Sequence, residues 1–264
     1  MWCKNCNIET NDPICPICGS KTVEDIPVEV YWCPECKVPV INTTTQADKG
    51  LCPLCGHKTK YLSADLRPVF PEERLLLELL LGKKPYEYMQ KSVWAANSSY
   101  YIDGKRVALP AKFFEKADTD ELSKQLEEYK GENSYEYFNV YAERFCEANR
   151  NRLNYLVDEA SEFVRNAASK FDEERLVVSF SGGKDSTVTA DLAINALGTS
   201  SIVHIFGNTT LEFPTTGEYA ERYRHNHPHA IFMVAKNEEQ NFIDVCEDIG
   251  PPARMMRWCC SMFK

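Results

Sequence analysis

The chain has 264 residues, more than one domain usually contains, and its apolar content of 44% is ordinary for a globular protein. No stretch approaches about eighteen uncharged apolar residues, and no basic segment followed by an apolar run opens the chain, so we expect two or three domains, a cytoplasmic location and no membrane partner. The net charge of -9 argues against binding that depends mainly on neutralising phosphates; a nucleic-acid partner is left open but is not favoured.

Eight of the twelve cysteines form four CxxC pairs in the first part of the chain. In a chain without a signal peptide, such pairs indicate thiolates held by metal in a reducing compartment. Each CxxC turn can present two sulfur atoms, and two turns complete a tetrahedral zinc site with bonds of about 2.3 Å. The spacing therefore predicts two zinc ribbons in residues 1–62, with the ligands Cys3, Cys6, Cys15 and Cys18 in the first and Cys33, Cys36, Cys52 and Cys55 in the second.

Both zinc sites are expected to be structural, because cysteine fills all four positions and leaves none for water. Iron is the main competitor, since the CPLCG knuckle also resembles rubredoxin, and interleaved pairing between the two sets is left open by the spacing. Residues 1–62 carry six lysines and no arginine against seven acidic residues. A role in docking a protein or a domain is therefore at least as well supported as a role in binding nucleic acid.

Residues 63–132 are predicted to form a small α+β linker unit whose role the sequence does not indicate. Proline and two acids suit the first turn of a helix over 71–82, which glycine ends. A hairpin is expected to turn at Asp103-Gly104. Asp118 followed by Glu121 resembles a capping box and should begin an acidic helix that ends near 131.

A longer helical pattern follows, in which apolar residues recur every three or four positions between Phe138 and Ala167, with a polar break at 149–152. We expect this stripe to pack on the sheet that comes next. Three short apolar runs, 176–180, 201–206 and 230–235, alternate with helical segments. This alternation predicts an α/β, Rossmann-like parallel sheet in residues 133–264, with its ligand crevice at the carboxyl ends of the strands.

The sequence SFSGGKDST lies where the first of these strands should give way to a helix. Gly182 and Gly183 permit positive φ angles and close backbone approach, so successive N–H groups can form an anion nest at a helix N-terminus. Lys184 adds positive charge, and Asp185 is suited to bind Mg²⁺ that bridges phosphates. Neither a Walker loop nor the dinucleotide pattern GxGxxG is present. The alternative is a plain Gly-Gly turn between strand and helix.

Three ordered segments resemble a known family: SGGKDS after a strand, IFGNTTLEFPTT at the exit of the second strand, and PPARMMRWCCSMFK. Together they are similar to the phosphoadenosine phosphosulfate (PAPS) reductase branch of the N-type ATP pyrophosphatase (PP-loop) superfamily, whose fold is adenine nucleotide alpha hydrolase-like. The resemblance implies that the loop cradles phosphate or sulfate, that the strand exits border the adenosine, and that cations face the far side of the anion. The implied site residues are Phe180, Ser181, Gly182, Gly183, Lys184, Asp185, Ser186, Thr187, Phe206, Asn208, Glu212, Arg254, Arg257 and Lys264, with Lys184 and Asp185 catalytic.

The resemblance implies an enzyme that binds PAPS or ATP with Mg²⁺ and carries out sulfur chemistry, aided by a reductant or a sulfur-carrier protein. Reductases of the family use a cysteine in a C-terminal tail, which this sequence lacks, so the domain looks truncated. The intact SGGKDS loop favours the alternative of AMP-forming, ATP-dependent thiolation of RNA or DNA. Outside enzymes, the alternative is a zinc-ribbon adaptor whose nucleotide domain only senses its ligand.

Overall fold

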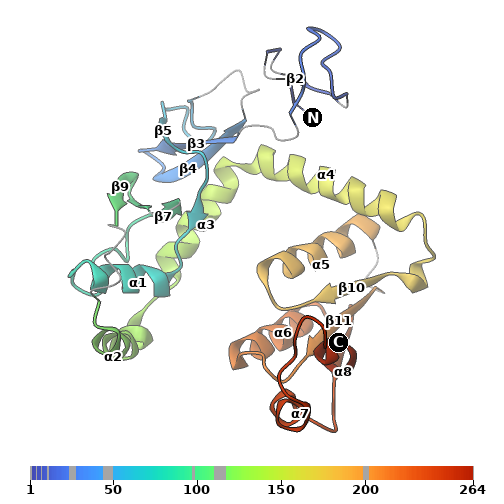
Figure 1. The fold of residues 1–264 in the computed structure, drawn as a ribbon. Coiled ribbons are helices and arrows are strands. Elements are labelled where there is room, and N and C mark those ends of the chain that lie inside the picture. Colours follow the sequence, from blue (N-terminus) through green and yellow to red (C-terminus); the bar gives the residue numbers. More distant parts are fainter. Residues whose placement is uncertain are drawn as a thin grey trace. The chain divides into compact units, whose positions relative to one another are not determined.

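The computed structural model describes the chain except residues 1, 4, 7, 11, 24–27, 44–49, 97–98, 110–116, 199–201 and 264. The chain divides into two compact units, residues 1–153 and 154–264 (Figure 1). The division into 1–62, 63–132 and 133–264 stays a prediction. In the part of the chain that the structure describes, no helix is long and apolar enough to cross a membrane.

The first unit begins with the two cysteine-rich ribbons. In the first ribbon, the short strands β1 (Trp2–Cys3) and β2 (Ile8–Glu9) pair antiparallel. In the second, three antiparallel strands are arranged in the order β4-β3-β5, namely β3 (Val28–Cys33), β4 (Val38–Thr43) and β5 (Lys60–Ser63). Strands this short bury little apolar surface, so side chains around the cysteines have to complete the core.

The linker segment forms a four-stranded antiparallel sheet and two helices. The sheet has the order β6-β7-β8-β9, and its strands are β6 (Arg67–Pro68), β7 (Val93–Ala96), β8 (Ser99–Ile102) and β9 (Lys105–Ala108). The hairpin turn at Asp103-Gly104 is confirmed, with φ angles of 46° and 76° at the two turn residues. Two consecutive positive φ angles match the twist of a tight hairpin, which explains the Asp-Gly pair.

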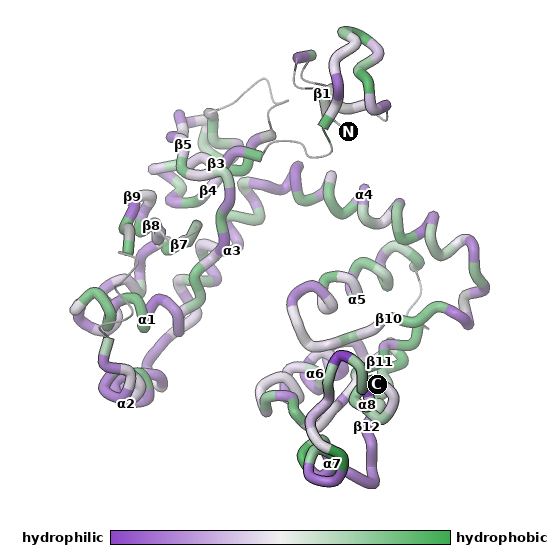
Figure 2. The backbone as a smooth tube through the Cα atoms, in the orientation of Figure 1, coloured by the Kyte–Doolittle hydropathy of each residue, from purple (hydrophilic) through white to green (hydrophobic). Residues whose placement is uncertain are grey.

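Both predicted helices of this segment are confirmed. Helix α1 (Pro71–Leu80) has proline in its first turn and ends before Gly82, whose φ is +64°. Helix α2 (Thr119–Tyr129) is capped by the Asp118 carboxylate, which accepts the N–H groups of Asp120 and Glu121, and a 3₁₀ turn (Lys130–Glu132) follows it. The largely hydrophilic α2 buries none of its residues (Figure 2).

The long helical pattern is broken at Asn149, inside the predicted break, into α3 (Glu136–Ala148) and α4 (Arg150–Ala168). The expectation that its whole apolar stripe packs on the following sheet is wrong. On α3, Tyr141 and Phe145 pack against the core of the second ribbon, and on α4 the Phe163 side chain is 74% exposed. The cause is a contact between residues far apart in the sequence: the Asn149 side-chain amide bonds to the backbone of β4, which commits α3 to the first unit.

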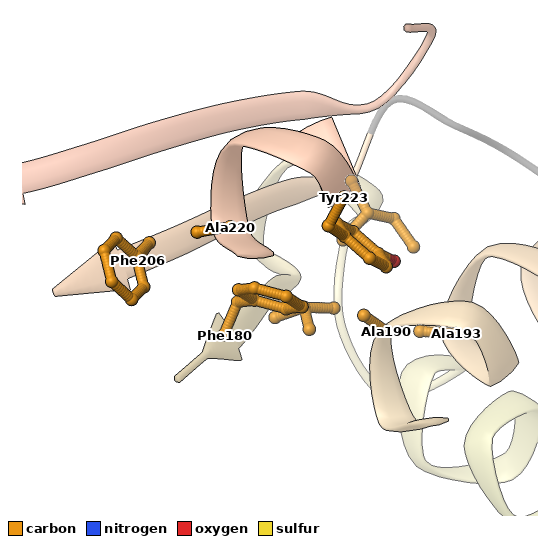
Figure 3. Close-up of a cluster of buried hydrophobic side chains, with 8 residues drawn as sticks. Phe180, Ala190, Ala193, Phe206, Ala220 and Tyr223 are labelled. Carbon is orange, nitrogen blue, oxygen red and sulfur yellow. The ribbon is translucent and has the colours of Figure 1, made fainter. Parts of the chain in front are cut away.

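The second unit contains the predicted parallel sheet, in the order β10-β11-β12. Its elements in chain order are a 3₁₀ turn (Glu173–Arg175), β10 (Val177–Phe180), α5 (Lys184–Leu197), β11 (Val203–Asn208), α6 (Pro214–Asn226), β12 (Ile231–Lys236), α7 (Phe242–Ile249) and α8 (Trp258–Phe263). The predicted Rossmann-like α/β class is confirmed. Figure 3 shows the core, where Phe180 and Phe206 from the sheet meet alanines of α5 and α6 and the Tyr223 ring.

Candidate nucleotide-binding site and metal centres

The SGGKDS loop joins the carboxyl end of β10 to the first turn of α5, as the sequence predicted. Gly182 has a φ of +75°, and a Cβ atom there would lie 3.0 Å from Cγ2 of Thr216 on α6. Gly183 is the extended N-cap of α5, and no side chain caps the helix. The N–H groups of the first turn are therefore left for a ligand, at the positive end of the helix dipole.

Hydroxyl groups hold the loop in this shape. The Ser186 hydroxyl accepts the N–H of Ser181 at 3.2 Å and donates to the Gly183 carbonyl at 3.0 Å. The Thr187 hydroxyl donates to the same carbonyl at 2.9 Å and accepts from the Tyr219 hydroxyl at 3.1 Å. These bonds fix the backbone around the anion nest, so the N–H groups are positioned before a ligand arrives.

Lys184 and Asp185 project from the first turn into solvent, with side chains 87% and 88% exposed, and form an ion pair with each other. An ammonium group beside the nest can add charge to a bound phosphate, while an exposed carboxylate can hold Mg²⁺. Lys184 is thus suited to bind the phosphate groups of a magnesium-bound polyphosphate, and Asp185 is suited to bind its Mg²⁺ ion.

The exit of β11 forms a tight polar turn on the same edge of the sheet. Asn208 accepts the N–H of Thr210, whose φ is +70°, and the Thr209 hydroxyl donates to Glu212 at 2.7 Å. Partial burial favours the protonated form of Glu212, but hydrogen bonds from Thr209 and from nearby backbone N–H groups outweigh it and lower the pKa of this carboxyl. Glu212 is therefore anionic near neutral pH, with one buried oxygen that has no partner among the described residues.

The side chains of two expected site residues, Phe180 and Phe206, are turned away from this edge of the sheet. Phe180 and Phe206 are 1% and 3% exposed, because their rings form the core between the sheet and α5 and α6. The Phe180 ring lies 4.5 Å, between centroids, from that of Tyr223. A nucleotide could meet these two residues only through their backbone in this conformation.

The segment carrying Arg254 and Arg257 leads into α8, and the last residues of α8 lie near the carboxyl ends of β11 and β12. A Cβ atom on Gly207 would come 4.0 Å from the Phe263 carbonyl, and the Asn237 amide donates to the Met262 carbonyl at 3.5 Å. Both arginines are exposed. Neither guanidinium group forms a hydrogen bond with another described residue, so their role at the site stays a prediction. Lys264 lies outside the described residues.

The cysteines gather in the two predicted sets and not in interleaved ones. Within each set, the four Sγ atoms lie within 4.8 Å of one another. A tetrahedral ion with bonds of about 2.3 Å separates its sulfur ligands by about 3.8 Å, so both sets fit one ion each. The N–H groups of Cys6 and Cys36 point at the sulfurs of Cys3 and Cys33, at 3.4 Å in both cases. Both sets fit zinc, and the ligand type also admits iron.

The crowded thiols cannot all ionise without a cation. The hydrogen bond to Cys18 and burial raise the pKa of Cys6 to about 12, while hydrogen bonds from Ser20 lower the pKa of Cys18 to about 6. In the second set, burial raises the pKa of Cys33 to about 11, and a hydrogen bond from His57 lowers the pKa of Cys55 to about 6. A divalent ion would stabilise all four thiolates at once.

A known family model matches the part of the chain that contains the SGGKDS loop. Residues 175–264 match the family model of the phosphoadenosine phosphosulfate reductase domain. The chain is 31% identical over 141 residues to the uncharacterized protein MJ0066 of Methanocaldococcus jannaschii, covering 53% of this chain and 28% of that protein. It is 25% identical over 124 residues to the uncharacterized protein MJ0973 of the same organism, covering 46% of this chain and 29% of that protein. No solved structure matches the chain significantly.

The part of the chain that carries the SGGKDS loop is therefore similar to the PAPS reductase domain, which belongs to the PP-loop superfamily. The chain spans under a third of the length of the curated relatives it matches.

Sequence reasoning missed the contribution of α6 to the loop. Thr216 limits what can replace Gly182, and the Tyr219 hydroxyl bonds to Thr187. The spacing of three between these residues puts both on one helix face, but nothing local indicated that this face meets the loop.

Proposed function

We propose that this chain binds a magnesium-bound adenine nucleotide at the SGGKDS loop and carries out sulfur chemistry, either reduction of PAPS or transfer of sulfur to an acceptor. The observation that carries the proposal is the intact loop itself, with Gly182 at positive φ, an uncapped α5 and two exposed charges at Lys184 and Asp185. A nest of this kind stabilises the negative charge on a bound or departing phosphate group. Lys184 would hold the anion and Asp185 would hold Mg²⁺.

In the reductive reaction, PAPS would accept two electrons from an external dithiol and give sulfite and adenosine bisphosphate, while the dithiol becomes a disulfide. That dithiol would come from a partner such as a reductant or sulfur-carrier protein, acting in the cytoplasm. The second candidate is ATP-dependent thiolation of RNA or DNA, in which an acceptor oxygen attacks the α-phosphorus and pyrophosphate leaves. A sulfide-level sulfur nucleophile, supplied by a sulfur-carrier protein, would then displace AMP and take the place of that oxygen. Retention of both Lys184 and Asp185 favours this candidate, because a departing pyrophosphate needs a cation and a metal ligand.

The deciding experiment incubates the zinc-loaded chain and Mg²⁺ separately with α-labelled ATP and with PAPS plus a dithiol, and measures AMP, pyrophosphate and sulfite. Sulfite from PAPS supports reduction, and AMP with pyrophosphate only in the presence of a nucleic-acid acceptor supports thiolation. Lys184→Ala should abolish the productive reaction, whereas Lys170→Ala, a change at an exposed turn that precedes β10, should leave it unchanged. Nucleotide binding without turnover would exclude both reactions and favour the adaptor.

A further inference from the structure

A second polar hollow lies in the first unit, between the second ribbon and the turn that joins α3 to α4. Its volume is about 300 Å³. Its walls are Ile41 and Asn42 at the end of β4, the knuckle residues Pro53 and Leu54, and the segment 147–152. The SGGKDS loop belongs to the other unit, so the hollow is separate from the site described above.

The walls of the hollow are held together by contacts that need no ligand. Asn149 is 7% exposed; its side-chain oxygen accepts the N–H of Ile41 at 2.7 Å and its amide donates to the Pro39 carbonyl at 3.1 Å. Beside it, Ala148 is buried in the cluster that contains Cys33 and Cys52. The hollow is thus preformed on the metal-binding ribbon, which lowers the cost of ordering a site when a ligand binds.

One residue of the lining, Asn42, carries an unsatisfied donor. Asn42 is only 4% exposed, and its amide nitrogen is buried without a hydrogen-bond partner among the described residues. Buried polar groups are almost always paired, and an unpaired donor is unfavourable. A ligand that enters the hollow with an acceptor oxygen would remove this penalty.

Another part of the lining is the first turn of α4, which begins at Arg150 directly after the turn at Asn149. Arg150, Asn151 and Arg152 all line the hollow. The N-terminal end of a helix of this length carries partial positive charge, and guanidinium groups bind oxyanions through paired N–H donors. Among the described residues of the lining, Glu147 is the one carboxylate, against two arginines. Charge and donors both indicate an anion with several acceptor oxygens.

We propose that this hollow binds a phosphate group, which would accept hydrogen bonds from the Asn42 amide and from Arg150 at the start of α4. The volume exceeds what a lone phosphate needs, so a phosphate that belongs to a nucleotide, free or within a strand, fits the same donors. A single phosphate site of this kind is compatible with the acidic chain, because it needs only local positive charge. The proposal does not depend on the function of the SGGKDS loop.

The test is an NMR titration of the zinc-loaded, ¹⁵N-labelled chain at low salt, following the Asn42 side-chain amide and the backbone amides of 150–152. Three probes are used: inorganic phosphate, AMP and a single-stranded oligonucleotide. We expect saturable shifts of these signals, with affinity reduced about tenfold or more by Arg150→Glu. Arg144→Glu makes the same charge change on α3 outside the lining and should leave the affinity unchanged. Asn42→Leu should weaken binding without reversing charge.

Tighter binding of the oligonucleotide than of AMP would support a phosphodiester as the source of the phosphate, and equal binding of AMP and phosphate would support a free one. The proposal is overturned if none of the probes shifts these signals, or if Arg150→Glu and Arg144→Glu weaken binding equally. Spectra of each variant without ligand report whether it is folded. Should Arg150→Glu fail to fold, Arg150→Gln replaces it with the same expected direction.

Discussion

The second ribbon and the sheet of the second unit achieve stability in different ways. Around the second ribbon, the buried cluster consists of two cysteines, two valines and one alanine: Cys33, Val38, Val40, Cys52 and Ala148. The sheet of the second unit instead packs on α5 and α6 through phenylalanine, tyrosine and alanine side chains, and no metal-type cluster occurs among its described residues. A small cysteine-rich unit needs an ion to replace the missing apolar area, whereas an α/β layer does not.

The difference also separates the chemistry of the units. In the ribbons, N–H groups point at sulfur and cysteine supplies all four ligand atoms of each set, an arrangement that fits a structural metal site. At the SGGKDS loop, N–H groups and two charged side chains are left exposed to solvent. The exposed charged groups of the loop thus occur where apolar packing supports the backbone.

Removing metal should have the largest effect, and only on the first unit. Cys33→Ser, or a strong chelator, should unfold the second ribbon, because structural zinc contributes about 10–16 kcal/mol in comparable small folds. Hydrogen exchange would show lost protection in β3 and β4 with β10 and β11 unchanged. Cys146→Ser, an exposed cysteine on α3 outside both sets, is the matched control and should have no effect. Equal loss of protection in both units would contradict the comparison.

Phe180→Ala should destabilise the second unit by about 3–5 kcal/mol, because it opens a cavity in a fully packed core. The Phe180 side chain is 1% exposed and lies among the rings of Tyr219, Tyr223 and Phe232. The free energy of unfolding would be measured by urea titration, and hydrogen exchange of the β11 amides would report on the second unit. Phe163→Ala removes a ring that is 74% exposed and should cost about 0.5 kcal/mol or less. Similar losses for the two variants would show that this core does not stabilise the loop domain.

Gly182→Ala should destabilise the loop by about 1–2 kcal/mol and weaken nucleotide binding, because a Cβ atom disfavours positive φ and would press on Thr216. Gly183→Ala is the matched control: its φ is -83° and its Cβ atom would lie 3.5 Å from the Ser181 hydroxyl, an ordinary contact. Calorimetric titration with magnesium ATP would compare the two. Stronger loss at Gly183 than at Gly182 would mean that the bound loop has a different backbone conformation.

The smallest expected effect is the pH dependence of the first unit due to Glu73. Hydrogen bonds from Arg67, at 2.6 Å to both carboxylate oxygens, hold the pKa of Glu73 below its usual value, although partial burial opposes them. The folded-state pKa is depressed, so the stabilisation is complete above the unfolded-state value of about 4.5 and is lost as pH falls through the lower folded-state value. Glu73→Gln should reduce the pH dependence of the free energy of unfolding, measured by urea titration at several pH values between 6 and 3. Glu136→Gln, at an exposed position of α3, should not reduce it.

Several features follow from short-range patterns and could be predicted. Each CxxC turn places two sulfurs by local geometry, Asp103-Gly104 allows the positive φ angles of a tight hairpin, and the glycines of the SGGKDS loop mark the junction of β10 and α5. The three strands were recognisable because apolar runs alternate with helical segments, which fixes their parallel direction. In each case the determining residues lie within one element or at its end.

The rest depends on residues that are far apart in the sequence. Asn149 reaches β4 across 108 positions, which directs α3 to the ribbon and prepares the hollow beside Asn42. Likewise, Tyr219 bonds to Thr187 across 32 positions, and burial takes the Phe180 ring away from the ligand edge. The sequence by itself determined the elements, the metal sets and the position of the loop, because these depend on near neighbours. Only the tertiary structure decided which faces meet, because periodicity shows that a face is apolar but carries no information about its partner.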